Sequence, residues 1–316
     1  MNKSRKMALS IVAIVVAIGL GVGVVLWVAP NFTSKKEATT SQAPHKKTGY
    51  AEVNGVNMYY EVHGNKNGKP PVLLLHGSHM NIELSFAEMI PKLAKDRQVV
   101  GIEIQGHGHT ADVEGRPLTH QQVADDIAGF LRQQNITKAD IFGWSMGGTL
   151  ATELVLRHPE LVRKVAVIGS NYRYYDEILT PEQYQQFIGV LDTGFSPKQL
   201  KEPYEKVSPH PEKWNELVTK LFAMDAQNKW PTDEQIKSIK VPFLIMSGDR
   251  DATPVSHALK WYSLLPKGQL DVLPHADHFA PVLQPQVVVD SLQTFLDAPE
   301  NLSTEHMNSP EALDKR

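Results

Sequence analysis

One serine lies inside a cluster of glycines in the stretch DIFGWSMGGTLA, residues 140–151. Gly143 and Gly147 flank Ser145 in the pattern G-x-S-x-G. Because glycine loses much conformational entropy on folding and contributes no packing, such a cluster indicates a backbone that bulkier residues would not fit. A serine on a strained strand-to-helix turn presents its hydroxyl as a nucleophile. The pattern therefore predicts acyl transfer at Ser145.

A serine nucleophile needs a base and an acid that orients the base, and the chain offers two candidates for each. The acids lie in LIMSGDRDATP, after an apolar run. We choose Asp251, because Asp249 is better placed to hydrogen-bond the turn backbone. The bases lie in LPHADHFAP. We choose His278 over His275, because it is closer to the final helix, where a loop can reach back over the sheet.

The oxyanion of an acyl-transfer reaction needs two hydrogen-bond donors. One is expected to be the backbone N–H of Met146, directly after the nucleophile. The other is expected from the loop HGSHMN that follows the apolar run VLLL, namely the N–H of Ser78. His76 at the start of this loop is expected to brace it without taking part in the chemistry.

The histidines also allow a metal interpretation. His107 and His109 in GHGH, with His275 and His278 in HADH, resemble pieces of metallohydrolase motifs. A catalytic zinc site usually has three close protein ligands and an open position. The H-x-H-x-D-H spacing of metal-dependent lactonases is absent, because Leu273 occupies the place of its first histidine. We therefore expect no metal and no cofactor.

Alternating short strands and helices must position these residues. A buried run such as VLLL is typical of a strand covered on both faces, and Asn54-Gly55 predicts a hairpin. A capping box at residues 119–122 predicts the start of a helix. Strands are expected at residues 50–53, 56–61, 72–75, 99–104, 140–142, 165–168, 243–246 and 270–273, and helices at 86–94, 119–134, 149–157, 255–265 and 286–296. This alternation favours a mostly parallel sheet covered on both faces.

One stretch breaks the alternation. Residues 171–237 have no strand pattern, are rich in Tyr, Trp and Gln, and contain two segments that begin with Pro at a first helical turn, PEQYQQFIGVL and PEKWNELVTKLF. Such a long excursion from an α/β core predicts a helical cap over the site. Its aromatic residues favour an apolar or aromatic substrate, although most of them are expected to pack between helices.

Composition excludes several classes of function. The chain has 316 residues, no cysteine and a net charge of −3. The absence of cysteine excludes disulfides, thiolate metal sites and a cysteine nucleophile. The charge gives no reason to expect nucleic acid as a partner. Apart from a tail at each end, about 250 residues remain for one large core or two small ones.

The N-terminal segment predicts a membrane anchor. Residues 8–29 carry no charge and follow Lys3, Arg5 and Lys6. A helix of this length spans a bilayer core of about 30 Å and is long for a cleaved signal peptide. The positive-inside rule then places the domain outside the cytoplasm, on a single-pass protein of the cell membrane. A cleaved signal peptide is the alternative.

Five segments resemble, in order, the motifs of the α/β-hydrolase fold family: LLLHGS, GIEIQGHGHT, GWSMGG, GDRD and HADHF. The resemblance covers about residues 50–297 and implies the nucleophile, acid and base chosen above, on a mostly parallel eight-stranded sheet with a helical cap. Within the family, the chain is similar to small-ester and C–C-bond hydrolases, including the valacyclovir-hydrolase-like group. That group often has an acidic residue where this chain has Met146, and the family often has Asp where it has Glu103.

Composition, element pattern and resemblance together divide the chain into five regions. They are an anchor at residues 1–30, a linker at 31–48, a hydrolase core at 49–170 and 238–297, a cap at 171–237 and a polar tail at 298–316. The expected function is hydrolysis of a small or medium carboxylic ester through an acyl-enzyme, with a small-molecule acyl substrate. Cofactor-free haloperoxidase-like chemistry, C–C-bond hydrolysis and a non-catalytic binding protein are the alternatives.

Overall fold

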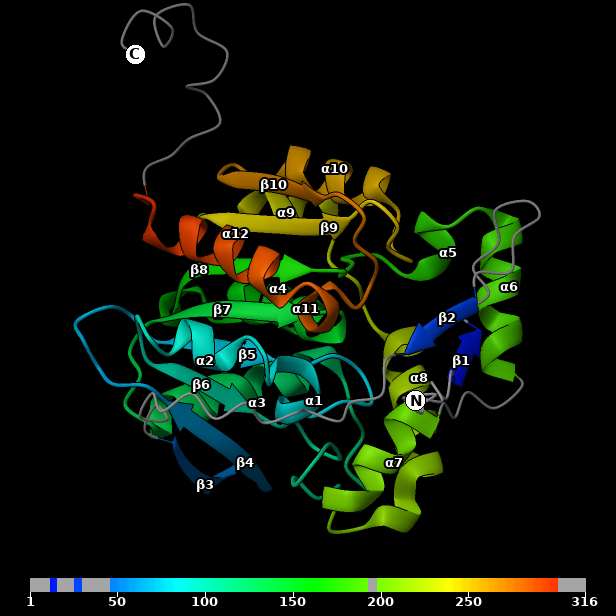
Figure 1. Ribbon diagram of the computed structural model, residues 1–316, viewed down its shortest axis with the longest axis horizontal. Coiled ribbons are helices and arrows are strands. Elements are labelled where there is room, and N and C mark those ends of the chain that lie inside the picture. Colours follow the sequence, from blue (N-terminus) through cyan, green and yellow to red (C-terminus); the bar gives the residue numbers. More distant parts are fainter. Residues whose placement is uncertain (1–11, 16–25, 30–45, 193–197, 301–316) are drawn as a thin grey trace, which may run out of the picture.

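The computed structural model describes residues 12–15, 26–29, 46–192 and 198–300, and its centre is an eight-stranded sheet (Figure 1). The spatial order is β10-β9-β8-β7-β5-β6-β4-β3. Strands β3 and β4 are antiparallel, β4 is antiparallel to β6, and the other neighbours are parallel. The mostly parallel sheet is therefore confirmed. The strands are β3 (Lys46–Val53), β4 (Val56–His63), β5 (Val72–Leu75), β6 (Val99–Ile102), β7 (Ala139–Trp144), β8 (Val162–Ile168), β9 (Phe243–Gly248) and β10 (Gly268–Leu273).

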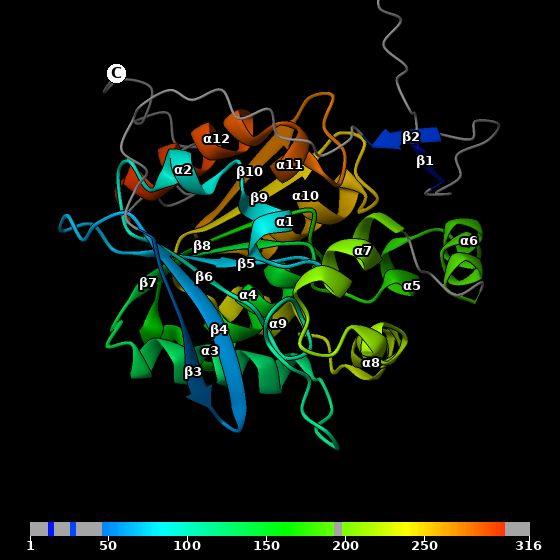
Figure 2. The same ribbon diagram turned by 60° about the horizontal axis from the view of Figure 1, so that its bottom comes forward.

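Helices cover both faces of this sheet (Figure 2). One apolar cluster joins one face to α3, α4 and α10, and a second joins the other face to α1, α2 and α12. Neighbouring residues of one strand enter different clusters: Ile141 lies in the first and Phe142 in the second. The core helices are α1 (Ile82–Phe86), α2 (Ile90–Leu93), α3 (His120–Gln133), α4 (Met146–Arg157), α10 (Val255–Leu264), α11 (Ala280–Leu283) and α12 (Pro285–Asp297), with a short 3₁₀ turn η1 (Pro159–Leu161).

Local signals account for several of these elements. All residues of β5 and β7 are buried, as expected for strands covered on both faces. Asn54 and Gly55 join β3 to β4 with φ of 50° and 85°, the left-handed geometry of a tight hairpin turn. The Thr119 hydroxyl caps α3 by accepting a hydrogen bond from the N–H of Gln122 at 3.1 Å.

The strand register brings five loops to one edge of the sheet. Leu75 pairs with Gly143, Trp144 with Ile168, and Gly248 with Leu273. The loops that follow β5, β7, β8, β9 and β10 therefore begin side by side. In an open α/β sheet, the carboxyl edge of the strands is where sites form.

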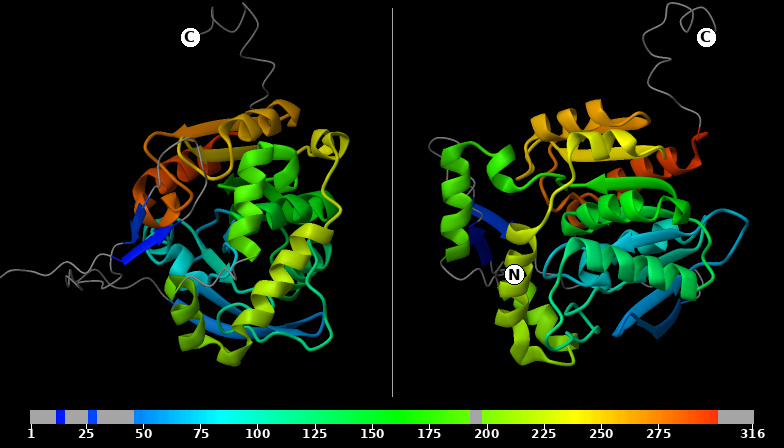
Figure 3. Two further views of the ribbon diagram at one scale, coloured as in Figure 1. Left: turned by 90° about the vertical axis from the view of Figure 1, so that its right-hand side faces the viewer. Right: turned by 180° about the vertical axis from the view of Figure 1, so that it is seen from behind.

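The stretch expected to be a cap lies between β8 and β9 and forms helices. Helices α5 to α8 lie beyond the carboxyl edge of the sheet (Figure 1 and Figure 3). The last helix of this stretch, α9, instead packs against α4 and α10. These elements are α5 (Tyr175–Ile178), α6 (Pro181–Asp192), α7 (Lys198–Val207), α8 (Trp214–Gln227) and α9 (Asp233–Ser238), with a short 3₁₀ turn η2 (Pro211–Lys213) before α8.

The ends of the chain differ from their predictions where the structure describes them. Two pieces of the expected membrane helix, β1 (Val12–Val15) and β2 (Leu26–Ala29), pair as antiparallel strands. The β-branched Val and Ile that dominate the segment favour extended backbone. Its other residues lie outside the described ranges, as does the tail beyond residue 300. Within the described residues, no helix has the length and apolar character to cross a bilayer. Strand β3 begins inside the expected linker, at Lys46.

Candidate active site

Ser145 occupies a strained turn between β7 and α4. Its φ of 55° and ψ of −123° lie in a region that only glycine adopts freely. The glycines around it are needed for space. A Cβ on Gly143 would overlap the backbone of Gly147, a Cβ on Gly147 would overlap the carbonyl of Leu75, and a Cβ on Gly148 would overlap Ser170. The turn therefore holds Ser145 only because positions 143, 147 and 148 have no side chains.

The structure brings together the three residues that the sequence selects. His278 Nδ1 lies 2.9 Å from Asp251 Oδ1, and His278 Nε2 lies 3.0 Å from Ser145 Oγ. Because the buried Asp251 carboxylate accepts hydrogen bonds, Nδ1 carries the proton and donates to it, which leaves Nε2 to accept from the serine hydroxyl. The chain of hydrogen bonds joins loops after β7, β9 and β10.

The competing acid and base lie elsewhere. Asp249 Oδ1 accepts a hydrogen bond from the N–H of Ala276 at 3.2 Å, so this carboxylate ties the turn after β9 to the loop after β10. His275 points its Nδ1 at Arg250, 3.2 Å from the guanidinium. Neither side chain hydrogen-bonds Ser145 or His278. Both help to shape the loops that carry Asp251 and His278.

The environment of His278 favours its role as a base. Burial by itself lowers the pKa of its imidazole, but the charge of Asp251 and the hydrogen bond to it raise the pKa more, so it lies above the ordinary 6.5. The carboxylate of Asp251 is fully buried, and its Oδ1 also accepts from the N–H of Thr253 at 3.0 Å. An acid held in this way can stabilise an imidazolium as it forms.

Gly169 makes room for this pair, and no sequence signal pointed to it. It directly follows β8 with a φ of 59°. A Cβ there would lie 2.9 Å from Asp251 Oδ2 and 3.0 Å from His278 Nδ1. Any larger residue would therefore meet both strain and a clash at the hydrogen bond between acid and base.

The side chain of Trp144 positions the base by a hydrogen bond to the backbone of His278. The indole N–H of Trp144 donates to the carbonyl of His278 at 2.8 Å, and its ring packs edge-on against Phe279 at 5.8 Å between centroids. Trp144 precedes Ser145 and is almost fully buried. One rigid side chain therefore links the nucleophile turn to the loop that carries the base.

The segments that carry the two expected oxyanion donors, Met146 and Ser78, both adjoin Ser145. Met146 is the first residue of α4, so its N–H is one of those at the helix start that have no intrahelical acceptor. The loop of Ser78 follows β5, and a Cβ on the preceding Gly77 would lie 3.6 Å from the Ser145 Cβ. The loop that carries Ser78 thus approaches the side chain of Ser145.

His76 braces the loop of Ser78. Its Nε2 accepts from the N–H of Ile104 at 3.2 Å, and its Nδ1 donates to the carbonyl of Gly77 at 2.9 Å. Burial lowers the pKa of this imidazole, which keeps it neutral and able to do both. On the far side of Ser78, His79 has a φ of 63° and packs its ring against Trp214 of α8.

The remaining motif histidines make local contacts. The buried Glu103 accepts from the backbone N–H of His109 at 2.6 Å and from the N–H of Ile82 at 3.2 Å, so it joins two loops. His107 Nδ1 lies 3.1 Å from the carbonyl of Gln105. No group of three potential metal ligands gathers within the part of the chain that the structure describes.

Similar proteins identify the family of the chain. The model of the alpha/beta hydrolase family matches residues 72–291, more than half of the chain. The chain is 27% identical over 232 residues to the pimeloyl-[acyl-carrier protein] methyl ester esterase of Neisseria meningitidis, covering 67% of this chain and 72% of the esterase. It is 23% identical over 248 residues to the 2-hydroxy-6-oxo-2,4-heptadienoate hydrolase of Pseudomonas putida, covering 72% and 89%.

A solved structure described as a bacterial membrane phospholipase A has a similar fold. Its TM-score is 0.67 at 21% identity, over 81% of this chain and 87% of that chain. An identity this low establishes likeness of fold alone. The family match, the relatives and the fold confirm the resemblance that the sequence motifs indicated. The chain therefore belongs to the alpha/beta hydrolase family and is a hydrolase.

Proposed function

We propose that this protein hydrolyses a small or medium carboxylic ester through an acyl-enzyme on Ser145. The observation that carries the proposal is the unbroken chain of hydrogen bonds from Ser145 Oγ through His278 to the buried Asp251. The strained backbone of Ser145 supports it, because such strain persists where function requires it. The esterase among the relatives supports the choice of an ester bond.

In the proposed mechanism, His278 takes the proton of the Ser145 hydroxyl as Oγ attacks the ester carbonyl. The N–H groups of Met146 and Ser78 stabilise the oxyanion, and Asp251 stabilises the imidazolium. His278 then protonates the leaving alcohol, and the acyl group remains on Ser145. A water molecule, deprotonated by His278, attacks the acyl-enzyme and releases the acid.

Covalent labelling tests this proposal. The full chain is treated with a fluorophosphonate, and the modified peptide is identified by mass spectrometry. We expect the phosphonyl group on Ser145 and loss of activity toward p-nitrophenyl acetate, butyrate and octanoate in proportion to labelling. A chain that hydrolyses these esters but carries the label on another serine, or none, would contradict the assignment of the nucleophile.

Hydrolysis of a hydroxy-oxo-dienoate is a second candidate, and the Pseudomonas putida relative favours it. Such dienoates absorb light strongly, so their consumption is followed directly. Turnover of a dienoate faster than every ester in the panel would replace the first candidate. Peroxide-dependent halogenation, measured in the same preparation, tests the haloperoxidase-like alternative.

We also propose that residues 8–29 anchor the protein in the cell membrane, with the catalytic domain outside the cytoplasm. The support is the uncharged 22-residue run that follows three basic residues. Cell fractionation tests the anchor: the protein should stay with membranes at alkaline pH and leave them with detergent. External protease on intact cells tests the orientation, since only an exposed domain is cut. Release at alkaline pH would contradict the anchor.

A further inference from the structure

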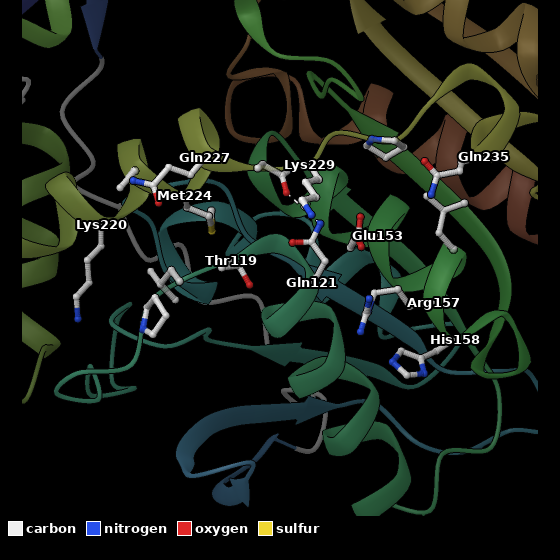
Figure 4. Close-up of a pocket in the computed structure, with 16 residues that line it drawn as sticks. Thr119, Gln121, Glu153, Arg157, His158, Lys220, Met224, Gln227, Lys229 and Gln235 are labelled. Atoms are coloured by element: carbon white, nitrogen blue, oxygen red, sulfur yellow. Dashed lines mark hydrogen bonds between the residues drawn. The ribbon is translucent and has the colours of Figure 1, made fainter.

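A cavity lies away from Ser145, at the other end of α4 (Figure 4). Its volume is about 880 Å³, within the range of small-molecule sites. We call it the cap–core cavity, because its walls come from α8 and the segment after it on one side and from α3, α4 and α9 on the other. Figure 4 shows Gln121 and Glu153 on the core side and Met224 and Gln227 on α8. Ser145, Asp251 and His278 do not line it.

Three of the four cationic side chains around the cap–core cavity already have carboxylate partners. Arg157 donates two hydrogen bonds to Asp125, at 2.9 and 2.7 Å, and His158 lies 2.7 Å from the same carboxylate. Lys220 pairs with Asp112. Lys229 is exposed at the rim. The interior of the cavity therefore has no buried cation in need of an anion.

Glu153 is the exception among the charged groups. It lines the cavity, is only 8% exposed, and has no ion pair within 4 Å among the described residues. Burial raises the pKa of its carboxyl, and the charges of His120 and Arg157 and the amide of Gln121 offset this only in part. A buried carboxylate without a close cation is costly to keep in a fold.

An unpaired amide lies on the same wall. Asn228 Oδ1 accepts from Gln121 Nε2 at 3.0 Å, which fixes the orientation of its amide. Its Nδ2 is buried and has no acceptor among the described residues. Buried polar groups are nearly always satisfied, so this N–H needs an acceptor from outside the chain, whereas Glu153, which the Gln121 amide already hydrogen-bonds, lacks only a cation.

The lining also contains six apolar residues beside its polar and charged ones, and these six select the apolar body of a bound molecule. The apolar residues are Pro117, Leu118, Leu156, Ala223, Met224 and Pro231. We propose that the cap–core cavity binds a small amphiphilic amine, whose ammonium group pairs with Glu153 and whose apolar body lies against these residues. The site is separate from Ser145, so the inference does not depend on the proposed ester hydrolysis.

Binding of matched probes tests this inference. Calorimetry on the full chain carrying Ser145→Ala compares n-hexylamine, n-hexanol and hexanoate, which share one apolar body and differ in charge. We expect n-hexylamine to bind at least about tenfold more tightly than the other two, because a hydrogen-bonded charge pair contributes that much. Equal affinities, or no binding of n-hexylamine, would overturn the proposal.

Two variants and one control locate the site. Glu153→Gln keeps the shape of the side chain and should remove the preference for the amine. Ala223→Leu should weaken all three probes by filling the cavity. Glu160→Gln changes a mostly exposed carboxylate three residues beyond α4 that pairs with Arg132, and should leave binding unchanged. Retained amine preference in Glu153→Gln would place the amine elsewhere and overturn the assignment, whatever the ester assays show.

Discussion

Helix α4 carries two sites of opposite character at its two ends. At its start, Ser145 belongs to a chain of hydrogen bonds in which His278 uses both ring nitrogens on partners from the chain. Toward its other end, Glu153 lines a cavity and has no cation within 4 Å among the described residues. A base whose two ring nitrogens are already bonded indicates a site organised for chemistry before its substrate arrives. A carboxylate without a cation indicates a site that its ligand completes.

The two sites also differ in the elements that hold them. The serine site is held by loops that leave neighbouring parallel strands at one edge, so the sheet itself aligns it. The cap–core cavity is held by helices, and its cap side comes from an insertion between β8 and β9. Variants at one end of α4 should therefore change reaction rates, and variants at the other end should change binding.

Ser145→Ala should have the largest effect. Without the nucleophile, kcat for p-nitrophenyl butyrate is expected to fall by about 10⁴-fold or more, while n-hexylamine binding is unchanged. Steady-state kinetics and calorimetry on one preparation measure both. Ser263→Ala, at an exposed serine of α10, is the control and should keep full activity. A Ser145→Ala chain with more than a few per cent of native activity would exclude the acyl-enzyme on this residue.

Asp251→Asn should lower kcat by roughly 10³-fold at neutral pH, because an amide cannot hold the Nδ1–H tautomer of His278. It should also move the pH profile. The base must be neutral, so kcat/KM rises with pH through the His278 pKa, and in the native chain the midpoint lies above 6.5. Loss of the Asp251 charge should lower that midpoint.

Asp249→Asn is the matched control for this variant. Its side-chain oxygen can still accept from the N–H of Ala276, so both rate and profile should stay close to native. A pH profile that shifts equally in Asp249→Asn and Asp251→Asn would show that Asp251 has no special part in setting the pKa of the base.

Gly169→Ala should lower kcat by roughly tenfold to a hundredfold and stability by about 1–3 kcal/mol, because the new methyl group meets Asp251 and His278 at a φ of 59°. Gly115→Ala is the control for strain alone, since Gly115 has a φ of 70° and open space around it. Activity and thermal unfolding are measured on both. Equal loss of activity in the two variants would mean that the contact with the acid and base does not matter.

Trp144→Phe should lower kcat by about threefold to tenfold and leave KM nearly unchanged. The variant removes the hydrogen bond to the carbonyl of His278, and one such bond contributes about 0.5–1.5 kcal/mol. Trp261→Phe is a matched control, because the Trp261 indole N–H is buried without an acceptor among the described residues. A similar fall in kcat in both variants would point to general loosening of the core.

Glu153→Gln should have the smallest effect on catalysis, and it tests the comparison most directly. Glu153 makes no contact with the serine site, so kcat and KM for p-nitrophenyl butyrate are expected within about twofold of native, a range typical of substitutions away from such features. The same variant should lose its preference for n-hexylamine. If kcat in Glu153→Gln falls well below native together with the loss of amine preference, the two ends of α4 act as one site.

Local signals predicted more of the core than of the ends. All eight expected strands of the sheet occur, with the expected bounds for residues 72–75 and shifted bounds for the others, since short apolar runs between turns have few other solutions. The helix expected at residues 86–94 is instead split between α1 and α2, with Pro91 in the first turn of α2. Proline lacks the N–H that would continue the earlier helix, so one continuous helix does not form there.

The sequence by itself determined the serine site, because each of its parts lies in a short motif with its own geometric reason. Glycines around Ser145 permit one turn, and an acid and a base follow successive strands. Only the tertiary structure decided the space that Gly169 leaves, the bond from Trp144 to His278 and the cap–core cavity. These features depend on residues far apart in the chain, and no local pattern records which groups face each other across a gap.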